Sequence, residues 1–331
     1  MTTGTGAAGA SLAPVPTRPI ARRKPWAYAD NAYQGLLGAC ALFVFLVAAL
    51  IVFESTRGAQ LSLRTFGWQF FTSTTWDPVA EKFGALPYVY GTLVTSTIAM
   101  LLAVPLGIGA AVFLSELAPP RVGEAVAFVV DLLASIPSIV YGLWGLFVLA
   151  PILRSAVEPW LIQHLGFMPL FRGPPFGIGI LNAGIVLAIM VLPTVVSISR
   201  EILLATPRSL REAALALGST RAEAIAVAVD AARPGILGAV ILALGRALGE
   251  TMAVTMVIGN TNRISASLLA PGSTMASVIA NEFTEATGAL YLSALIEVAL
   301  VLFALTLVVN AAARLLVHLA TGGRRDVAGT A

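Results

Sequence analysis

The stretch EILLATPRSLREAALALGSTRAEAIAVAVDAARPG, residues 201–235, is polar and carries several arginines, and it lies between two long hydrophobic runs. The chain of 331 residues is 58% hydrophobic and 11% charged, with a mean hydropathy of +0.89. Soluble domains are typically about a quarter charged. We therefore predict an all-α polytopic membrane protein in which residues 201–233 fold outside the bilayer.

Six segments have the length of a membrane-spanning helix, because a helix rises about 1.5 Å per residue and needs roughly 20 apolar residues to cross the hydrocarbon core. The fifth segment contains Arg246 and Glu250, and the sixth contains Glu297. We predict a six-helix transmembrane domain over residues 32–316. The segments are 32–53, 89–114, 132–150 (with a start near Glu124 as an alternative), 178–199, 234–259 and 290–313.

The two ends of the chain, residues 1–31 and 317–331, are predicted to be tails. The first is rich in Gly, Ala, Thr and Pro and has a basic cluster near Arg22, which is typical of a disordered topology anchor. A cleaved signal peptide is the competing interpretation, because Leu37–Cys40 resembles a lipoprotein cleavage box. The apolar run continues to residue 53, which favours a retained first helix.

The distribution of Lys and Arg predicts the orientation. Six spans place both termini on one side, and that side holds thirteen of these residues, against six on the other. An excess of basic residues marks the cytoplasmic side. We therefore expect both tails and the 201–233 loop to be cytoplasmic, and the 54–88 loop to be extracytoplasmic. The six residues on the opposite side are Arg57, Arg64, Lys82, Arg154, Arg172 and Arg263.

The 201–233 loop has the pattern of two capped helices. Thr206-Pro207 and Ser209–Glu212 are both predicted helix starts, the second as a capping box, and the short helix should run through Leu217 and stop at Gly218. Thr220–Glu223 is a second capping box, which opens an Ala-rich helix expected to end before Pro234. The loop is thus predicted to be two helices joined by a glycine corner. Amphipathic helices lying on the membrane surface are the alternative.

Glu212-Ala213-Ala214, with Gly218 six positions after the glutamate, resembles the EAA motif of ABC importer permeases, in which a coupling helix inserts into a cleft of the ATPase subunit. Those families usually continue into a Leu-Pro pair, where this chain has Val229–Ala232. The resemblance implies an ATPase-docking surface made of Arg211, Glu212, Ala213, Ala214, Gly218, Thr220 and Arg221.

ATP binding is expected to lie in another polypeptide. Lys24 and Lys82 are the two lysines of the chain, and neither is followed by Ser or Thr, so a Walker A loop is excluded. No catalytic residues, no resident cofactor and no metal site are predicted, because His164 and His318 have no partners at ligand spacing. We expect a transport subunit that is not itself an enzyme, with ATP and Mg²⁺ bound by a partner ATPase.

Three further stretches, Trp76–Gly107, Ser135–Leu146 and Gly245–Val254, resemble the PstC-type permease of the phosphate-specific ABC importer. The resemblance covers roughly residues 66–315. It implies a type I ABC importer permease fold in the bacterial plasma membrane, surrounded by lipid, and inorganic phosphate as the substrate. The implied partners are a PstA-type second permease, a PstB-type ATPase dimer and an extracytoplasmic PstS-type phosphate-binding protein. Nothing indicates nucleic acid binding.

Arg246 is the strongest candidate for contact with phosphate. An intramembrane arginine persists only where it faces a partner or a watery cavity, and its planar guanidinium matches an oxyanion. Glu250, four residues later, is expected on the same helix face, either orienting Arg246 or neutralising it as a buried ion pair. Other candidates for the substrate pathway, around the predicted kink at Pro137, are Ser135, Ser138, Tyr141 and Asp131.

Alternative functions keep part of this pattern. A permease for sulfate or molybdate would retain the coupling loop but not the Gly245–Val254 stretch. A secondary transporter would lack a docking loop and often shows inverted repeats, which are not found. The aromatic 54–88 loop fits contact with a binding protein or, equally, a helical hairpin on the membrane surface.

Overall fold

The computed structural model describes residues 27–322, and its regular structure is helical apart from two isolated β-bridges. The predicted tails fall mainly on residues 1–26 and 323–331, which lie outside the described residues. Contacts divide the chain after Ile51, so most of α1 (Ala27–Gly58) forms one unit and the remaining helices form another. These are α2 (Gln60–Phe66), α3 (Gln69–Thr72), α4 (Leu86–Val112), η2 (Phe113–Leu117), α5 (Pro120–Ala134), α6 (Ser138–Trp144), η3 (Gly145–Leu149), α7 (Ala150–Ile152), η4 (Leu153–Val157), α8 (Glu158–Leu165), η5 (Pro169–Phe171), α9 (Ile180–Ala205), α10 (Arg208–Ala216), α11 (Arg221–Gly249), α12 (Met252–Val257), α13 (Met275–Glu282) and α14 (Ala289–Gly322).

Six helices are long and apolar enough to cross a membrane, which confirms the predicted all-α polytopic fold. Three of them, α4, α9 and α14, match the predicted spans closely, apart from their exact ends. The first and last extend into the predicted tails, because α1 begins at Ala27 and α14 ends at Gly322. The six helical stretches are Ala32–Gly58, Leu86–Leu117, Ser138–Leu165, Ile180–Ala205, Arg221–Gly249 and Ala289–Leu319.

The third predicted span is wrong as a single helix. Residues 132–150 are divided between α5 and α6 by a break at Ser135–Pro137, after which the helix continues through π-helical turns to Leu165. Pro137 has no N–H to donate, and a proline disfavours helical geometry in the residue before it. The proline therefore interrupts the helix instead of only kinking it.

The fifth predicted span is also wrong in its limits. α11 begins at Arg221, inside the predicted loop, and runs for 29 residues to Gly249, with Pro234 in its interior. The Ala-rich loop helix and the span are thus one helix. A proline removes one backbone hydrogen bond, but neighbouring helices can hold such a helix together in a bundle, and α11 packs on α4, α9 and α14.

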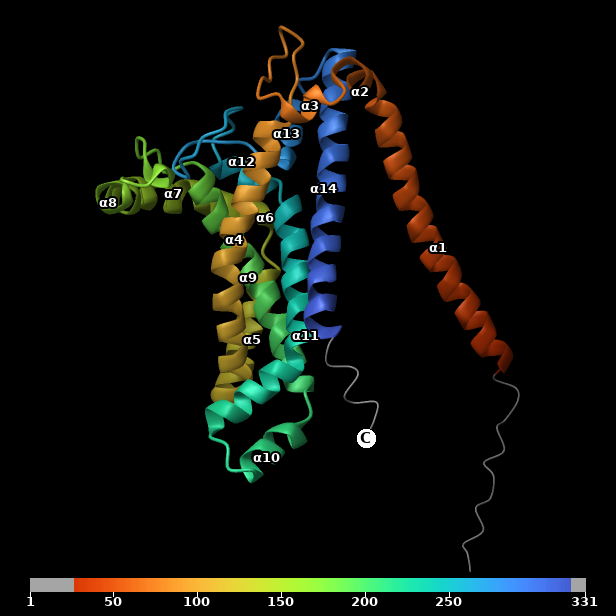
Figure 1. The fold of residues 1–331 in the computed structure, drawn as a ribbon, viewed down its shortest axis with the longest axis vertical. Coiled ribbons are helices and arrows are strands. Elements are labelled where there is room, and N and C mark those ends of the chain that lie inside the picture. Colours follow the sequence, from red (N-terminus) through yellow and green to blue (C-terminus); the bar gives the residue numbers. More distant parts are fainter. Residues whose placement is uncertain (1–26, 323–331) are drawn as a thin grey trace, which may run out of the picture. The chain divides into compact units, whose positions relative to one another are not determined.

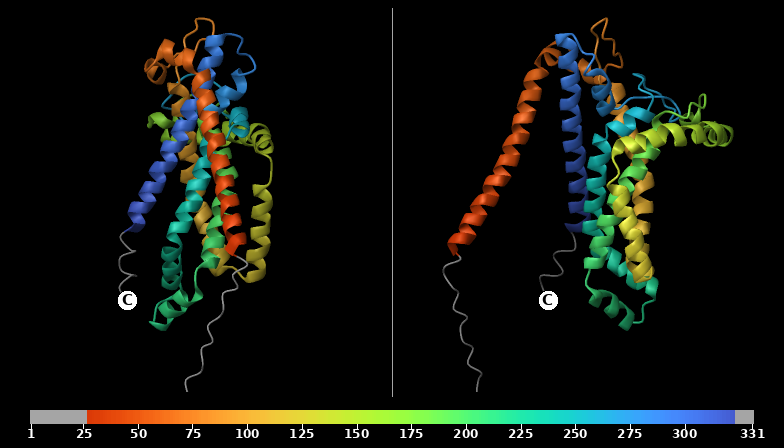
Figure 2. Two further views of the ribbon diagram at one scale, coloured as in Figure 1. Left: turned by 90° about the vertical axis from the view of Figure 1, so that its right-hand side faces the viewer. Right: turned by 180° about the vertical axis from the view of Figure 1, so that it is seen from behind.

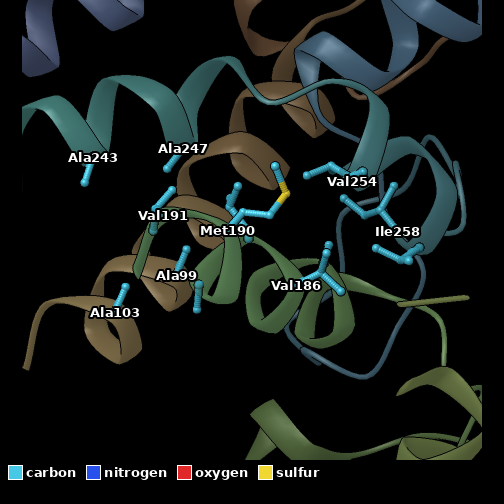
Figure 3. Close-up of a cluster of buried hydrophobic side chains, with 14 of the residues drawn as sticks. Ala99, Ala103, Val186, Met190, Val191, Ala243, Ala247, Val254 and Ile258 are labelled. Carbon is cyan, nitrogen blue, oxygen red and sulfur yellow. The ribbon is translucent and has the colours of Figure 1, made fainter. Parts of the chain in front are cut away.

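The core is centred on α9, which packs along α4 and α11 (Figures 1 and 3). Two-thirds of its most apolar window is buried, 67% against 28% for α4. Ala99, Ala103 and Ala243 are all fully buried there, and small residues let helix backbones approach closely. α9 is therefore the most buried of the six long helices.

The two ends of the bundle differ (Figure 2). α10 lies at one end, beyond α9 and α11, and α2, α3 and α13 lie at the opposite end, which we call the α13 end. There the 54–88 loop folds as short helices and a hairpin with a bridge between Asp77 and Lys82, and its contact with a binding protein stays a prediction. Trp76 Nε1 and Tyr291 OH both donate to Glu282 Oε2, at 2.6 and 2.8 Å, which fastens the hairpin to α13 and α14.

Candidate functional site

Two helices are interrupted inside the bundle. The α5–α6 break falls at Ser135–Pro137, and the α11–α12 break falls at Glu250 and Thr251, where Glu250 is extended with ψ 123°. At membrane depth, non-helical backbone is tolerated only where it is buried in protein or lines a watery cavity. The two breaks therefore mark the part of the bundle where a polar substrate could be accommodated.

The breaks lie together because α6 packs directly on α12. A Cβ added at Gly142 would lie 2.7 Å from Met256 Sδ and 3.0 Å from Ala253 Cα, and one at Gly145 would lie 2.9 Å from Val257. These contacts advance along both helices in the same direction. The N-terminal ends of α6 and α12, which carry a partial positive charge, thus come side by side.

Arg246 lies in the last turn of α11, next to this pair of helix ends. Its side chain is exposed in the chain, in the helical turn just before the α11–α12 break. A guanidinium beside two helix N-termini is an electropositive arrangement that suits an oxyanion.

Glu250 is the C-cap of α11, which ends at Gly249, and its ψ of 123° turns the following backbone away from the helix. Within residues 27–322 Arg246 and Glu250 form no ion pair. Instead Glu250 Oε1 accepts a hydrogen bond from Ala253 N at 3.3 Å, in the first turn of α12. The buried ion pair given as the alternative is thus not formed in the described residues, and the role of Glu250 in orienting Arg246 stays a prediction.

The other pathway candidates make contacts within the chain. Ser135 Oγ donates to Leu132 O at 2.7 Å, and Tyr141 OH donates to Leu133 O at 2.8 Å, so both satisfy carbonyls freed where α5 ends. Asp131 accepts a hydrogen bond from Ser197 of α9. Ser138 is half-buried at the start of α6.

Glu297 lies away from the breaks. It is fully buried in α14, beside Ser62 of α2. Its position matches helix packing near the α13 end more closely than a pathway residue.

The segment at the α10 end has the predicted corner but only one of the two predicted capping boxes. Thr220 and Glu223 form theirs, with Thr220 N donating to Glu223 Oε2 at 2.7 Å. Ser209 forms none, because α10 begins at Arg208 with Pro207 as its N-cap. Gly218 has a φ of +89°, in the left-handed region that favours glycine.

The surface of this segment differs from the expected one. Ala213, Glu212 and Gly218 are exposed, whereas Ala214 is buried within the chain. Arg211 is turned inward, to Glu116 of η2. Two exposed leucines, Leu215 and Leu217, were not predicted as part of the surface, although exposed apolar side chains on a short polar helix are the signal of a contact surface.

Six membrane-length helices, two helix breaks that lie together and a folded segment between spans define a multi-pass membrane transport component. The model of the binding-protein-dependent transport system inner membrane component family matches residues 103–320, and the chain belongs to that family.

Curated relatives cover almost the whole chain. A protein of Mesorhizobium japonicum named phosphate transport system permease protein PstC is 46% identical over 294 residues, which is 87% of this chain and 90% of that protein. Proteins with the same name from Xylella fastidiosa and Pasteurella multocida are 48% and 45% identical, over 88% and 84% of this chain and 91% and 88% of theirs.

A solved structure confirms the fold at greater distance. The inward-facing MetNI methionine ABC transporter superposes with a TM-score of 0.51 at 19% sequence identity, covering 70% of this chain and 93% of that one. The expected importer permease fold is therefore confirmed.

Proposed function

We propose that this chain is the permease subunit through which inorganic phosphate enters the cytoplasm in an ATP-driven importer. The observation that carries the proposal is Arg246 beside the paired N-terminal ends of α6 and α12, an electropositive site at two helix breaks. The relatives at 45–48% identity, all named for phosphate transport, support the same substrate.

Phosphate fits this site better than sulfate for a chemical reason. At neutral pH phosphate keeps at least one P–OH group, which must donate a hydrogen bond, whereas sulfate has only acceptors. Arg246 supplies donors, and the half-buried Glu250 supplies a nearby acceptor. Sulfate has no hydrogen to donate, so its binding would leave the Glu250 carboxylate without a partner, which lowers the affinity for sulfate relative to phosphate.

The partner subunits and the orientation in the membrane are proposed from the α10 segment and from the distribution of basic residues. α10 and the Gly218 corner dock on a separate ATPase, which binds ATP and Mg²⁺, so the chain does no covalent chemistry. A second homologous permease supplies the other half of the pathway, and a phosphate-binding protein docks at the α13 end. Both termini are cytoplasmic, in line with the Lys and Arg distribution. Transport proceeds by alternating access.

Uptake of labelled phosphate by the reconstituted complex tests the proposal. We expect uptake that requires ATP and falls by less than half in a tenfold excess of sulfate or molybdate, because a preference of ~1.4 kcal/mol for phosphate would give equal occupancy at that ratio. ATP-dependent uptake of labelled sulfate, or uptake driven by an ion gradient without the ATPase, would contradict it.

Gly218 gives a second test, directed at docking. Replacement by valine forces a β-branched residue to a φ of +89°, a strain of about 1–2 kcal/mol, and puts side-chain atoms on an exposed corner. We expect Gly218→Val to lower the amount of ATPase that copurifies by about tenfold. Gly218→Asn is the matched control, because asparagine tolerates the left-handed region and should retain the ATPase. Equal recovery from both variants and the wild type would argue against docking at this corner.

A further inference from the structure

Arg211 and Glu116 form a two-point contact between α10 and the end of α4. Arg211 Nε donates to Glu116 Oε2 at 2.9 Å, and Nη2 donates to Glu116 Oε1. The residues are 95 positions apart in sequence, and their side chains are only 19% and 8% exposed. A bidentate pair that is largely shielded from water has a fixed geometry, unlike a solvated surface ion pair.

The same guanidinium also holds the end of α9. Arg211 Nη1 donates to Thr206 O and Nη2 donates to Leu203 O, both at 3.0 Å. These carbonyls belong to the last turn and C-cap of α9, where a cation is favourable. One side chain therefore joins α10 to two helices, and its Nε, Nη1 and Nη2 atoms all donate within the chain.

The two helices held by Arg211 pack tightly on each other. A Cβ added at Gly107 of α4 would lie 2.7 Å from Val195 of α9, and one added at Gly184 of α9 would lie 2.6 Å from Ile98 of α4. Interlocked surfaces of this kind move as one body. α10 also packs on α11, and two non-helical bends, at Thr206–Pro207 and Gly218–Thr220, connect it to α9 and α11.

We infer that Glu116 and Arg211 are positioning residues that form a rigid joint, through which displacement of α10 is transmitted to the α4–α9 pair. This inference rests on the proposed function, in which an ATPase moves α10. It changes the role expected for Arg211, which serves the joint and leaves the contact with the ATPase to exposed residues such as Ala213, Leu215 and Leu217.

The test compares Glu116→Gln, Arg211→Gln and the double variant in the full reconstituted complex. We expect the ATPase to copurify as in the wild type and to hydrolyse ATP, while phosphate transported per ATP falls about tenfold in each single variant. Because both residues act through one contact, the double variant should be no worse than the weaker single variant. Arg121→Gln, an exposed arginine at the start of α5, is the control and should transport normally.

Arg211→Lys keeps the charge but cannot make two parallel hydrogen bonds, so it separates the joint from simple folding. We expect it to assemble and yet transport poorly. Normal transport by this variant would overturn the inference. So would additive losses in the double variant, or loss of the ATPase from Arg211→Gln alone, which would identify Arg211 as a docking residue.

Backbone amide exchange supplies a readout that does not depend on the cargo. When nucleotide is added to the assembled complex, exchange should change in residues 208–216 and in the end of α9 in the wild type, but only in residues 208–216 in the variants. A change that reaches α9 equally in all of them would overturn the joint. Wild-type complex that shows this propagation but takes up no phosphate would contradict the proposed substrate and leave the joint standing.

Discussion

Replacing Arg246 by glutamine is expected to lower phosphate uptake by about a hundredfold while leaving the complex assembled. Two hydrogen bonds from a guanidinium to an oxyanion contribute about 1.5 kcal/mol each at the low end, and ~3 kcal/mol corresponds to roughly two orders of magnitude. Assembly should survive because Arg246 is exposed in the chain and pairs with neither Glu250 nor another carboxylate in the described residues. Initial rates of labelled phosphate uptake, normalised to the amount of complex, measure the effect.

Two further variants serve as references for the uptake rate of Arg246→Gln. Arg246→Lys retains a positive charge without the planar fork, so its uptake should lie between those of Arg246→Gln and the wild type. Arg121→Gln removes an exposed arginine at the start of α5, far along the chain from the Ser135–Pro137 break. This variant should leave uptake unchanged. Uptake at the wild-type level in Arg246→Gln would remove the main support for a phosphate site at the two breaks.

Replacing Gly91 by alanine is expected to destabilise the whole fold. A Cβ there would lie 2.0 Å from Ser273 O and 3.0 Å from Ser273 C, and both are backbone atoms that cannot rotate away. Next to it, Thr92 Oγ1 accepts a hydrogen bond from Met275 N at 3.0 Å, so the start of α4 is bound to the start of α13. Overpacking of this kind costs about 3 kcal/mol, and the apparent melting temperature of the purified chain in detergent should fall accordingly.

Gly109, in the same helix, is the matched control. A Cβ at Gly109 has no atom within 4 Å, and alanine is favoured over glycine in a helix by roughly 1 kcal/mol. Gly109→Ala should therefore melt at or above the wild-type temperature. If both variants melted together with the wild type, the close contact between α4 and the 273–275 backbone would be wrong.

The length and composition of the hydrophobic runs were sufficient to predict the spans at α4, α9 and α14. The local signals for helix ends, a capping box and a proline, were less reliable than the hydrophobic runs. The box at Ser209 is absent because the helix begins at Arg208, two residues before the start that a Ser209 cap would give, which places Ser209 inside the first turn. Pro234, a strong stop signal in isolation, lies inside α11 because the helix is supported by its neighbours.

The candidate site shows the same limit. The sequence singled out Arg246 and the stretch around Pro137, and the structure places each of them at a helix break, with the two breaks brought together by the packing of α6 on α12. The break at Glu250 was missed, because no proline marks it and helical spacing pointed to a continuous face. The contact between Glu116 and Arg211 was missed because no pattern relates residues 95 positions apart.

The continuity of α11 has a mechanical consequence. A helix of 29 residues is about 43 Å long. It carries the Thr220–Glu223 cap at one end and Arg246 one turn from the other, and Pro234 lies between them as the point where the helix can bend. A tilt of the part after Pro234 by a few degrees displaces the guanidinium by ångströms. The continuity of one helix thereby links the distance that a partner pushes to the distance that a positive charge travels.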